Sequence, residues 1–196
     1  MKTSLRSLAL TGFVAAALAS AAARAAPVNY EIDPTHTYPS FEADHMGMSV
    51  WRGKFTNTTG KLVFDKATGR GSLDVKIDMD TVDFGLKQMN NVARSDEIFD
   101  TAKYGYAFYR GRLEGFTAGA PAQVVGELTL RGVTRPLTLK VNSFKCQPHP
   151  LFKRDWCGAD ATTTFQRDAF GIDAGKDYGF KMDVTLHIQV EAVAGE

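Results

Sequence analysis

The sequence predicts an all-β protein, and two observations carry that prediction. Between Val124 and Phe144, apolar and polar residues alternate on both sides of a central Arg131-Gly132 pair. Because successive side chains of a strand point to opposite faces, this period of two indicates two half-buried antiparallel strands. The same one-sided alternation recurs along most of the chain, giving a total of about eight strands, enough to pack as two sheets or to close into a barrel. Closure would remove every exposed sheet edge.

The hairpin at 124–144 is the clearest element. Its two arms share an apolar face made of Val124, Gly126, Leu128, Leu130, Leu137, Leu139 and Val141. Gly132 tolerates the positive φ that a tight turn requires. Pro136 cannot donate to a strand ladder, so we place it at the start of the second arm. The apolar face then needs further strands to cover it.

The remaining strands follow from the same alternation, taken in chain order. We expect them at residues 30–32, 37–45, 51–64 (two pieces joined by a turn at 57–60), 72–80, 104–113, 161–165 and 182–193. Segments 65–71, 115–121 and 168–179 have the composition of loops. Segment 86–99 instead has apolar residues at helical spacing, which predicts one or two short helices, the second beginning near Ser95.

The first 26 residues have the pattern of a secretory signal peptide. Lys2 and Arg6 precede an apolar run at 8–18, and small residues around Arg24 offer cleavage after Ala25 or Ala26. The run is shorter than the roughly 20 residues that span a bilayer, although an uncleaved anchor is the alternative. Residues 27–196 then form one domain. No later apolar run approaches spanning length, so we expect an exported, soluble protein without stable membrane insertion.

The net charge and the cysteines narrow the range of expected partners and the expected cellular compartment. Loss of the three cations of the signal peptide lowers the formal net charge from +1 to −2. No basic patch is visible, so nucleic acid is not an expected partner. Cys146 and Cys157 both lie in the exported part, where disulfides are favoured. We expect a structural disulfide across a long loop; a redox-active pair would usually show C-x-x-C spacing.

Motifs for catalysis and for metal binding are absent from the sequence. It contains no G-x-S-x-G, G-x-G-x-x-G or H-E-x-x-H pattern, and no two of its four histidines have metal-ligand spacing. His36 could hydrogen-bond a turn with Asp33 or donate to a ligand head group. Arg94, Arg131 and Arg135 are either surface charges or donors to a pyrophosphate.

Three blocks of the chain resemble the YceI-like family. They are D-P-x-H-T-x-x-x-F at 33–41 with H-x-G at 45–47, G-E-L-T-L-R-G-V-T-R-P at 126–136, and C-G-A-D-A-T-T-T-F-Q-R-D-A-F-G at 157–171. The resemblance covers nearly the whole mature chain. It implies an extended, lipocalin-like antiparallel barrel that resides in the periplasm and holds a polyisoprenoid or similar lipid. Before the F-D pair at 99–100 the chain departs from the family pattern, which leaves the head-group contacts open.

These observations lead to a prediction of function. We expect a carrier that sequesters a long isoprenoid or quinone-like lipid in its lumen, with no catalysis, no cofactor and no metal; homodimerisation stays open. The residues that we expect at the ligand are His36, Phe41, His45, Trp51, Phe84, Met89, Arg94, Phe99, Tyr106 and Phe108. Two alternatives remain: an enzyme acting on a lipid-like substrate, and a structural or stress-response protein whose core is filled by its own side chains.

Overall fold

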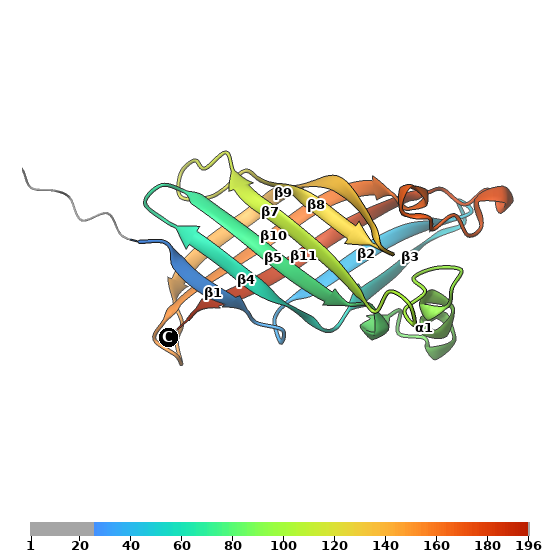
Figure 1. The fold of residues 1–196 in the computed structure, drawn as a ribbon, viewed down its shortest axis with the longest axis horizontal. Helices are drawn as coiled ribbons and strands as arrows, with labels where there is room; N and C mark the ends of the chain where they lie inside the picture. Colours follow the sequence, from blue (N-terminus) through green and yellow to red (C-terminus); the bar gives the residue numbers. More distant parts are fainter. Residues whose placement is uncertain (1–25, 196) are drawn as a thin grey trace, which may run out of the picture.

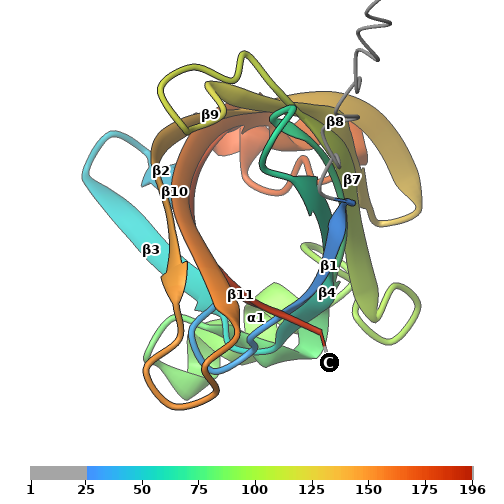
Figure 2. The same ribbon diagram turned by 90° about the vertical axis from the view of Figure 1, so that its left-hand side faces the viewer.

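The fold is a closed antiparallel β-barrel, and the computed structural model describes residues 26–195 of it. The predicted signal peptide lies outside the described residues, apart from Ala26. Viewed down its axis, the barrel is a ring of tilted strands (Figure 2). Eight strands close it in the order β1 (Val28–Ile32), β4 (Thr58–Asp65), β5 (Arg70–Asp78), β7 (Tyr106–Glu114), β8 (Gln123–Leu130), β9 (Val133–Pro148), β10 (Asp155–Gln166) and β11 (Asp183–Ala194), which returns to β1.

Three further strands extend the sheet beyond one end of the barrel. They are β2 (Tyr38–His45), β3 (Ser49–Phe55) and the short β6 (Val82–Asp83). Strand β11 is long enough to pair with β1 near its end and with β2 along its earlier part. The β2–β3 hairpin therefore projects from the same end of the molecule as helix α1 (Lys87–Arg94), on the right in Figure 1.

The sequence prediction that residues 51–64 form two strand pieces joined by a turn at 57–60 is wrong about how these strands are connected. The two strand pieces exist, but β3 pairs with β2 and β6, whereas β4 pairs with β1 and β5. Gly60 is not a turn residue, because it lies inside β4. A Cβ atom there would lie 2.4 Å from the carbonyl oxygen of Asp74, so this glycine permits close approach of two strands.

Two other local predictions need correction. Both cysteines lie within strands, as directly opposed residues of β9 and β10, so the connection between the strands spans only residues 149–154. The predicted second helix near Ser95 is a series of turns instead, in which the Asp100 amide donates to the Ser95 carbonyl at 2.7 Å. Short 3-10 turns occur at Met79–Thr81, Arg167–Phe170 and Lys176–Tyr178.

The hairpin at 124–144 has the predicted form. Strands β8 and β9 pair from Leu130↔Val133 outward, and Arg131 and Gly132 form the turn with φ of +49° and +75°. The inward faces of β5, β8, β9 and β11 are those that the alternation of apolar residues predicts. These faces meet inside the barrel and form its core.

Candidate ligand-binding cavity

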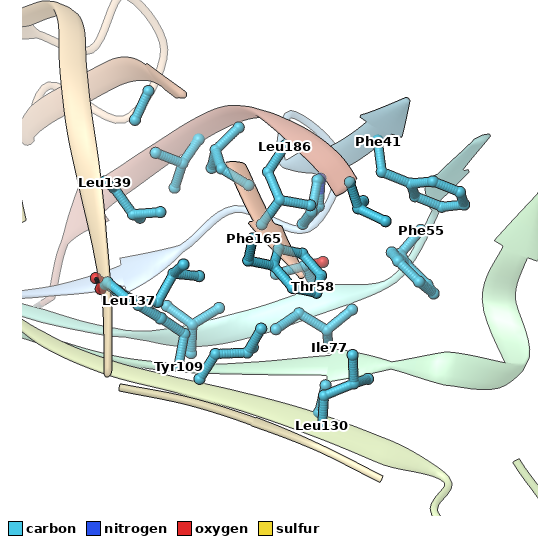
Figure 3. A pocket seen from close by; sticks show the side chains of 18 of the residues that line it. Phe41, Phe55, Thr58, Ile77, Tyr109, Leu130, Leu137, Leu139, Phe165 and Leu186 are labelled. Carbon is cyan, nitrogen blue, oxygen red and sulfur yellow. Dashed lines mark hydrogen bonds between the residues drawn. The ribbon is translucent and has the colours of Figure 1, made fainter. Parts of the chain in front are cut away.

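A long apolar cavity occupies the inside of the barrel. Its volume is about 320 Å³, which lies within the roughly 300–1,000 Å³ range of small-molecule sites. In Figure 3, Phe41 and Phe55 lie toward one end of the cavity and Leu137 and Leu139 toward the other. The strand walls are almost entirely aliphatic and aromatic, and they include Leu73, Val75, Ile77, Val124, Leu128, Leu130, Leu137, Leu139, Val141, Val184, Leu186, Ile188 and Val190.

One end of the barrel is filled by protein. Tyr30 and Phe64 are almost fully buried there, and the Phe64 ring packs against Phe116 and Phe144 at centroid distances of 5.9 and 5.6 Å. The disulfide between Cys146 and Cys157 joins β9 to β10 at the same end. The predicted disulfide is thus confirmed, and it lies beside the floor of the cavity.

Aromatic rings surround the cavity at the opposite end, beside α1. Phe41 contacts Phe55, Phe84 and Phe99 with ring centroids 5.4–6.3 Å apart. Such tilted and edge-on pairs contribute packing energy beyond the burial of their area. They form a neck that an apolar ligand would contact along its length.

Few polar side chains line the cavity, and the buried Tyr109 is one of them. Its hydroxyl donates to the carbonyl oxygens of Leu137 and Val124, at 2.9 and 3.1 Å. Burial raises the pKa of this phenol, which therefore stays neutral. Two paired glycines make room for it: a Cβ atom on Gly126 would lie 2.8 Å from the Tyr109 hydroxyl, and one on Gly111 would lie 3.1 Å from its ring.

Arg167 and Asp44 are the charged residues among those lining the cavity. Arg167 is buried, and its guanidinium donates to the carbonyl oxygens of Ile172 and Ala174 at 2.9 and 2.7 Å. Burial lowers the pKa of Arg167. Asp44 accepts from the Gly47 amide at 3.0 Å. Each charged group therefore has a local partner that fixes a loop beside the cavity.

Thr58 is a buried polar residue of the cavity wall whose hydroxyl is unpaired. Its side chain is fully buried beside the cavity, and its hydroxyl has no hydrogen-bond partner. An unpaired buried hydroxyl costs about 1–3 kcal/mol. In Figure 3, Thr58 lies among apolar side chains between the two ends of the cavity.

Half of the predicted ligand residues do line the cavity. Phe41, Trp51, Phe84, Met89 and Phe99 form part of its wall, all toward the aromatic neck. Their contact with a ligand stays a prediction. The sequence signal that unites them is the aromatic or flexible apolar character of their side chains.

The other five predicted residues lie outside the cavity wall. Tyr106 and Phe108 occupy the outer face of β7, because Ala107 and Tyr109 alternate with them and point inward. The Lys76 ammonium lies 4.5 Å from the centroid of the Tyr106 ring. His45 stacks on Trp51 with centroids 4.2 Å apart. The predicted alternation in β7 thus has the correct period, but the inner face is the one that carries Ala107, Tyr109 and Leu113.

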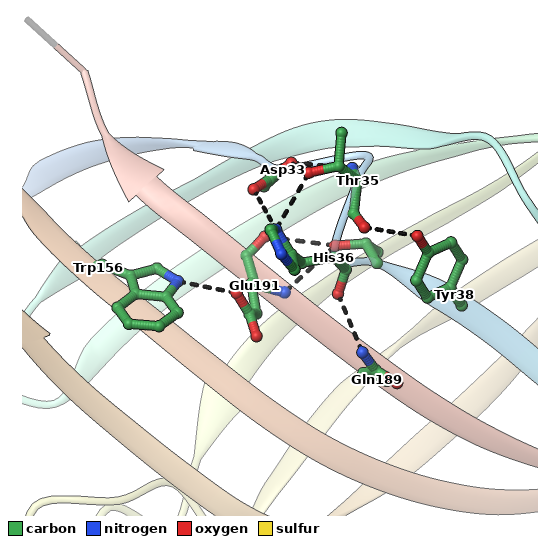
Figure 4. A network of polar contacts seen from close by, with 8 residues as sticks. Asp33, Thr35, His36, Tyr38, Trp156, Gln189 and Glu191 are labelled. Carbon is green, nitrogen blue, oxygen red and sulfur yellow. Dashed lines mark hydrogen bonds and ion pairs between the residues drawn. The ribbon is translucent and has the colours of Figure 1, made fainter. Parts of the chain in front are cut away.

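His36 belongs to a polar network on the outer surface, between β1 and β2 (Figure 4). Its Nδ1 lies 2.7 Å from a carboxylate oxygen of Asp33, and the hydroxyl of Thr35 contacts both side chains. The hydrogen bond to Asp33 raises the pKa of His36. Burial acts to raise the pKa of Asp33, but the hydrogen bonds from Thr35 and His36 outweigh it and lower this pKa. The interpretation of His36 as part of a turn is confirmed.

The three arginines that could donate to a pyrophosphate each donate to backbone carbonyl oxygens, and their contact with a ligand stays a prediction. Arg94 donates to the Asp80 carbonyl at 3.1 Å and Arg135 to that of Ala169 at 3.4 Å. Arg131 donates to three carbonyls, those of Asp96, Ile98 and Gly171. From the β8–β9 turn it thereby joins the segment after α1 to the loop after β10. No three His, Cys, Asp or Glu side chains gather within residues 26–195 in a way that could hold a metal ion.

None of the helices in the described part of the chain has the length and apolar character needed to cross a membrane.

Solved structures share this barrel. The chain superposes on BcnA of Burkholderia cenocepacia with a TM-score of 0.67 and 20% identity, covering 82% of this chain and 98% of that one. It superposes on a polyisoprenoid-binding domain from Saccharophagus degradans with a TM-score of 0.63 and 18% identity, covering 86% and 99%. At these identities the likeness establishes the fold.

Sequence comparison establishes the family. The chain is 30% identical to a UPF0312 protein of Shewanella sp. strain MR-7 over 98% of this chain and 99% of that protein. It is also 30% identical to a UPF0312 protein of Pseudomonas putida strain W619 over 92% and 96% of the two chains. The model of the YceI-like domain matches residues 30–192, which span nearly all of the barrel, and the chain therefore belongs to the YceI-like family.

Proposed function

We propose that this protein is exported to the periplasm, where it binds and sequesters one long isoprenoid or quinone-like lipid inside its barrel. The observation that carries the proposal is the apolar cavity, which has a protein-filled floor and an aromatic neck at the other end. Burial of a hydrocarbon contributes about 0.8 kcal/mol per CH₂. An extended prenyl chain could therefore be held by its tail alone. The polyisoprenoid-binding description of the Saccharophagus degradans relative supports this ligand class.

The cavity chemistry suits sequestration more than catalysis. Asp44 is the single carboxylate in the described cavity wall, and it accepts a hydrogen bond from a local amide. A hydrolytic or transfer reaction would need a second converging acid, base or nucleophile. The filled-core alternative requires side chains in the space that the cavity occupies. We therefore propose no catalytic step.

The two tryptophans offer a direct test of binding. Trp51 lines the cavity, whereas Trp156 donates to Glu191 at 3.1 Å on the outer surface. In a W156F background, Trp51 is the single tryptophan, because the sequence contains two. Titration with geranylgeraniol, a C20 isoprenoid alcohol added from a small volume of organic solvent, should change the Trp51 emission until one equivalent is bound.

A pair of matched variants separates cavity binding from surface adsorption. Ala161 is buried and lines the cavity, and Thr164 is an exposed residue of the same strand. A161F should exclude at least two CH₂-sized groups, worth about 0.8 kcal/mol each, and weaken binding at least tenfold. T164F should change the affinity less than twofold. Equal affinity in both variants, or no Trp51 response in the parent, would contradict the proposal.

A further inference from the structure

Three projecting elements surround the end of the barrel opposite the filled one. These are the β2–β3 hairpin, the segment that contains α1, and the loop 171–180, all at the right of Figure 1. Each of them also contributes to the cavity wall, through Trp51, Val92 and Phe180 respectively. Any ligand that enters at this end passes between them.

The tips of these elements carry large apolar side chains in water. Met48 is 84% exposed and Met46 51% exposed at the hairpin tip, Leu86 is exposed at the start of α1, and Tyr178 is exposed in the loop. Val92 is exposed on one side and lines the cavity on the other. Residues 46–50 include no charged side chain. The apolar lining of the cavity thus continues onto the outer rim of its mouth.

The hairpin tip contains a turn with two central residues, in which the Met48 amide donates to the His45 carbonyl at 2.9 Å. Met46 has φ of +56° and is followed by Gly47 at +72°. Left-handed backbone is adopted most readily by glycine and asparagine, and a long apolar side chain gains nothing from it. A hairpin turn of this type requires left-handed backbone at both central positions, so the turn explains the conformation of Met46 but not the choice of a long apolar side chain there. That side chain is half exposed at the hairpin tip.

We propose that this rim, formed by Met46, Met48, Leu86, Val92 and Tyr178, docks onto a lipid bilayer so that cargo passes between the bilayer and the cavity. The inference rests on the proposed function, since a long isoprenoid resides in a membrane.

Exposed apolar side chains on separate loops can each insert into the headgroup region of a bilayer. A stable dimer instead needs a continuous contact surface of about 800 Å² per partner. Helix α1 carries Lys87 and Arg94, and the loop 171–180 carries Asp173 and Asp177 with Lys176. The charge near the rim is therefore mixed, and the apolar side chains carry the inference.

The opposite end of the barrel supplies a matched control. Leu151 is 79% exposed in the β9–β10 loop, so its exposure resembles that of Met48, but it lies at the filled end. Its neighbour Phe152 stacks on His149 with centroids 4.4 Å apart. If any exposed apolar residue promoted membrane binding, replacing Leu151 would weaken that binding as much as replacing Met48. If only the rim docks onto the bilayer, replacing Leu151 should have little effect.

Flotation with phosphatidylcholine vesicles tests the inference. M46N/M48S should reduce the vesicle-bound fraction at least fivefold, and L151S should change it less than twofold. Asparagine suits the left-handed position 46, so the double variant should remain folded, which its urea midpoint verifies. In stopped-flow experiments on the W156F background, the same double variant should slow the uptake of geranylgeraniol from vesicles at least fivefold.

The outcomes separate this inference from the proposed function. If Trp51 reports geranylgeraniol binding but wild type does not float, or M46N/M48S floats and takes up lipid normally, docking through the rim is excluded and the carrier function stands. If light scattering shows a wild-type dimer that M46N/M48S dissociates, a second copy covers the rim and docking is likewise overturned. If Trp51 never responds, the carrier function itself fails.

Discussion

The hydroxyl of Thr37 completes the strand ladder opposite Glu191. It accepts from the Glu191 amide at 3.2 Å and donates to the Glu191 carbonyl at 3.3 Å, while the Asp33 amide donates to that carbonyl at 2.9 Å. Glu191 lies where β11 passes from pairing with β2 to pairing with β1. One side chain therefore satisfies backbone groups at a gap between two strands.

Removal of this hydroxyl should destabilise the barrel. We expect T37V to lower the free energy of unfolding by about 1–3 kcal/mol, because the half-buried Glu191 amide loses its acceptor. T37S keeps the hydroxyl and should recover most of the loss. Urea unfolding measures both variants, and equal stability of T37V and wild type would show that the ladder does not need the side chain.

The Asp33–His36 pair should make stability depend on pH in a defined window. The pKa of His36 is raised in the folded state, so its contribution is fully present below the unfolded pKa of about 6.5 and is lost as pH rises through the folded pKa. The pKa of Asp33 is lowered, so its contribution is lost as the solution becomes strongly acidic.

We therefore expect H36Q to lower Tm relative to wild type most clearly near pH 5.5 and least near pH 8. Thermal unfolding across this range is the measurement. A difference between the two proteins that grows toward pH 8 would have the wrong sign for this linkage.

The glycine pair beneath Tyr109 should tolerate no side chain. A Cβ atom on Gly126 would lie 2.2 Å from the Arg110 carbonyl and 2.8 Å from the Cα of Gly111, and both are backbone atoms that cannot rotate away. G126A should cost about 1–3 kcal/mol through overpacking. Gly158 is the control, since its nearest atoms lie at 3.6 Å. G158A should stay within about 0.5 kcal/mol of wild type; a similar loss in both variants would refute the close-approach explanation.

Replacement of Thr58 should not destabilise the protein, in contrast to the replacement of Gly126. Its buried hydroxyl has no partner, so replacement by the similarly shaped valine should leave the stability unchanged or raise it by about 1 kcal/mol. Chemical denaturation of T58V tests this expectation. A loss of more than 1 kcal/mol would mean that the hydroxyl is paired in solution.

The sequence predicts the inner faces of the barrel well and its connections less well. Alternation at Leu73–Ile77 and Val184–Val190 identifies the cavity wall, because half-buried strands must separate apolar from polar residues by face. Alternation cannot say which strands pair, so β3 and β4 looked like one hairpin. It also misjudged β7, where Tyr106 and Phe108 are large but point outward.

The sequence also predicts part of the candidate site. Aromatic residues of the neck stand out by type, and five of the predicted residues lie there. Tyr109, Thr58 and Arg167 were missed, since nothing local distinguishes an inward tyrosine, threonine or arginine. The pair Gly111 and Gly126 was the available signal for Tyr109: small residues facing each other across two strands leave space for a large side chain.

The most direct test of the account is chemical analysis of what the cavity holds. Protein purified without detergent from the periplasm would be extracted with organic solvent and analysed by mass spectrometry, beside A161F prepared identically. The account predicts a prenyl or quinone-like lipid at close to one equivalent in wild type and a several-fold lower amount in A161F. Wild-type protein that yields no lipid and does not bind added isoprenoid, or equal lipid from both proteins, would contradict it.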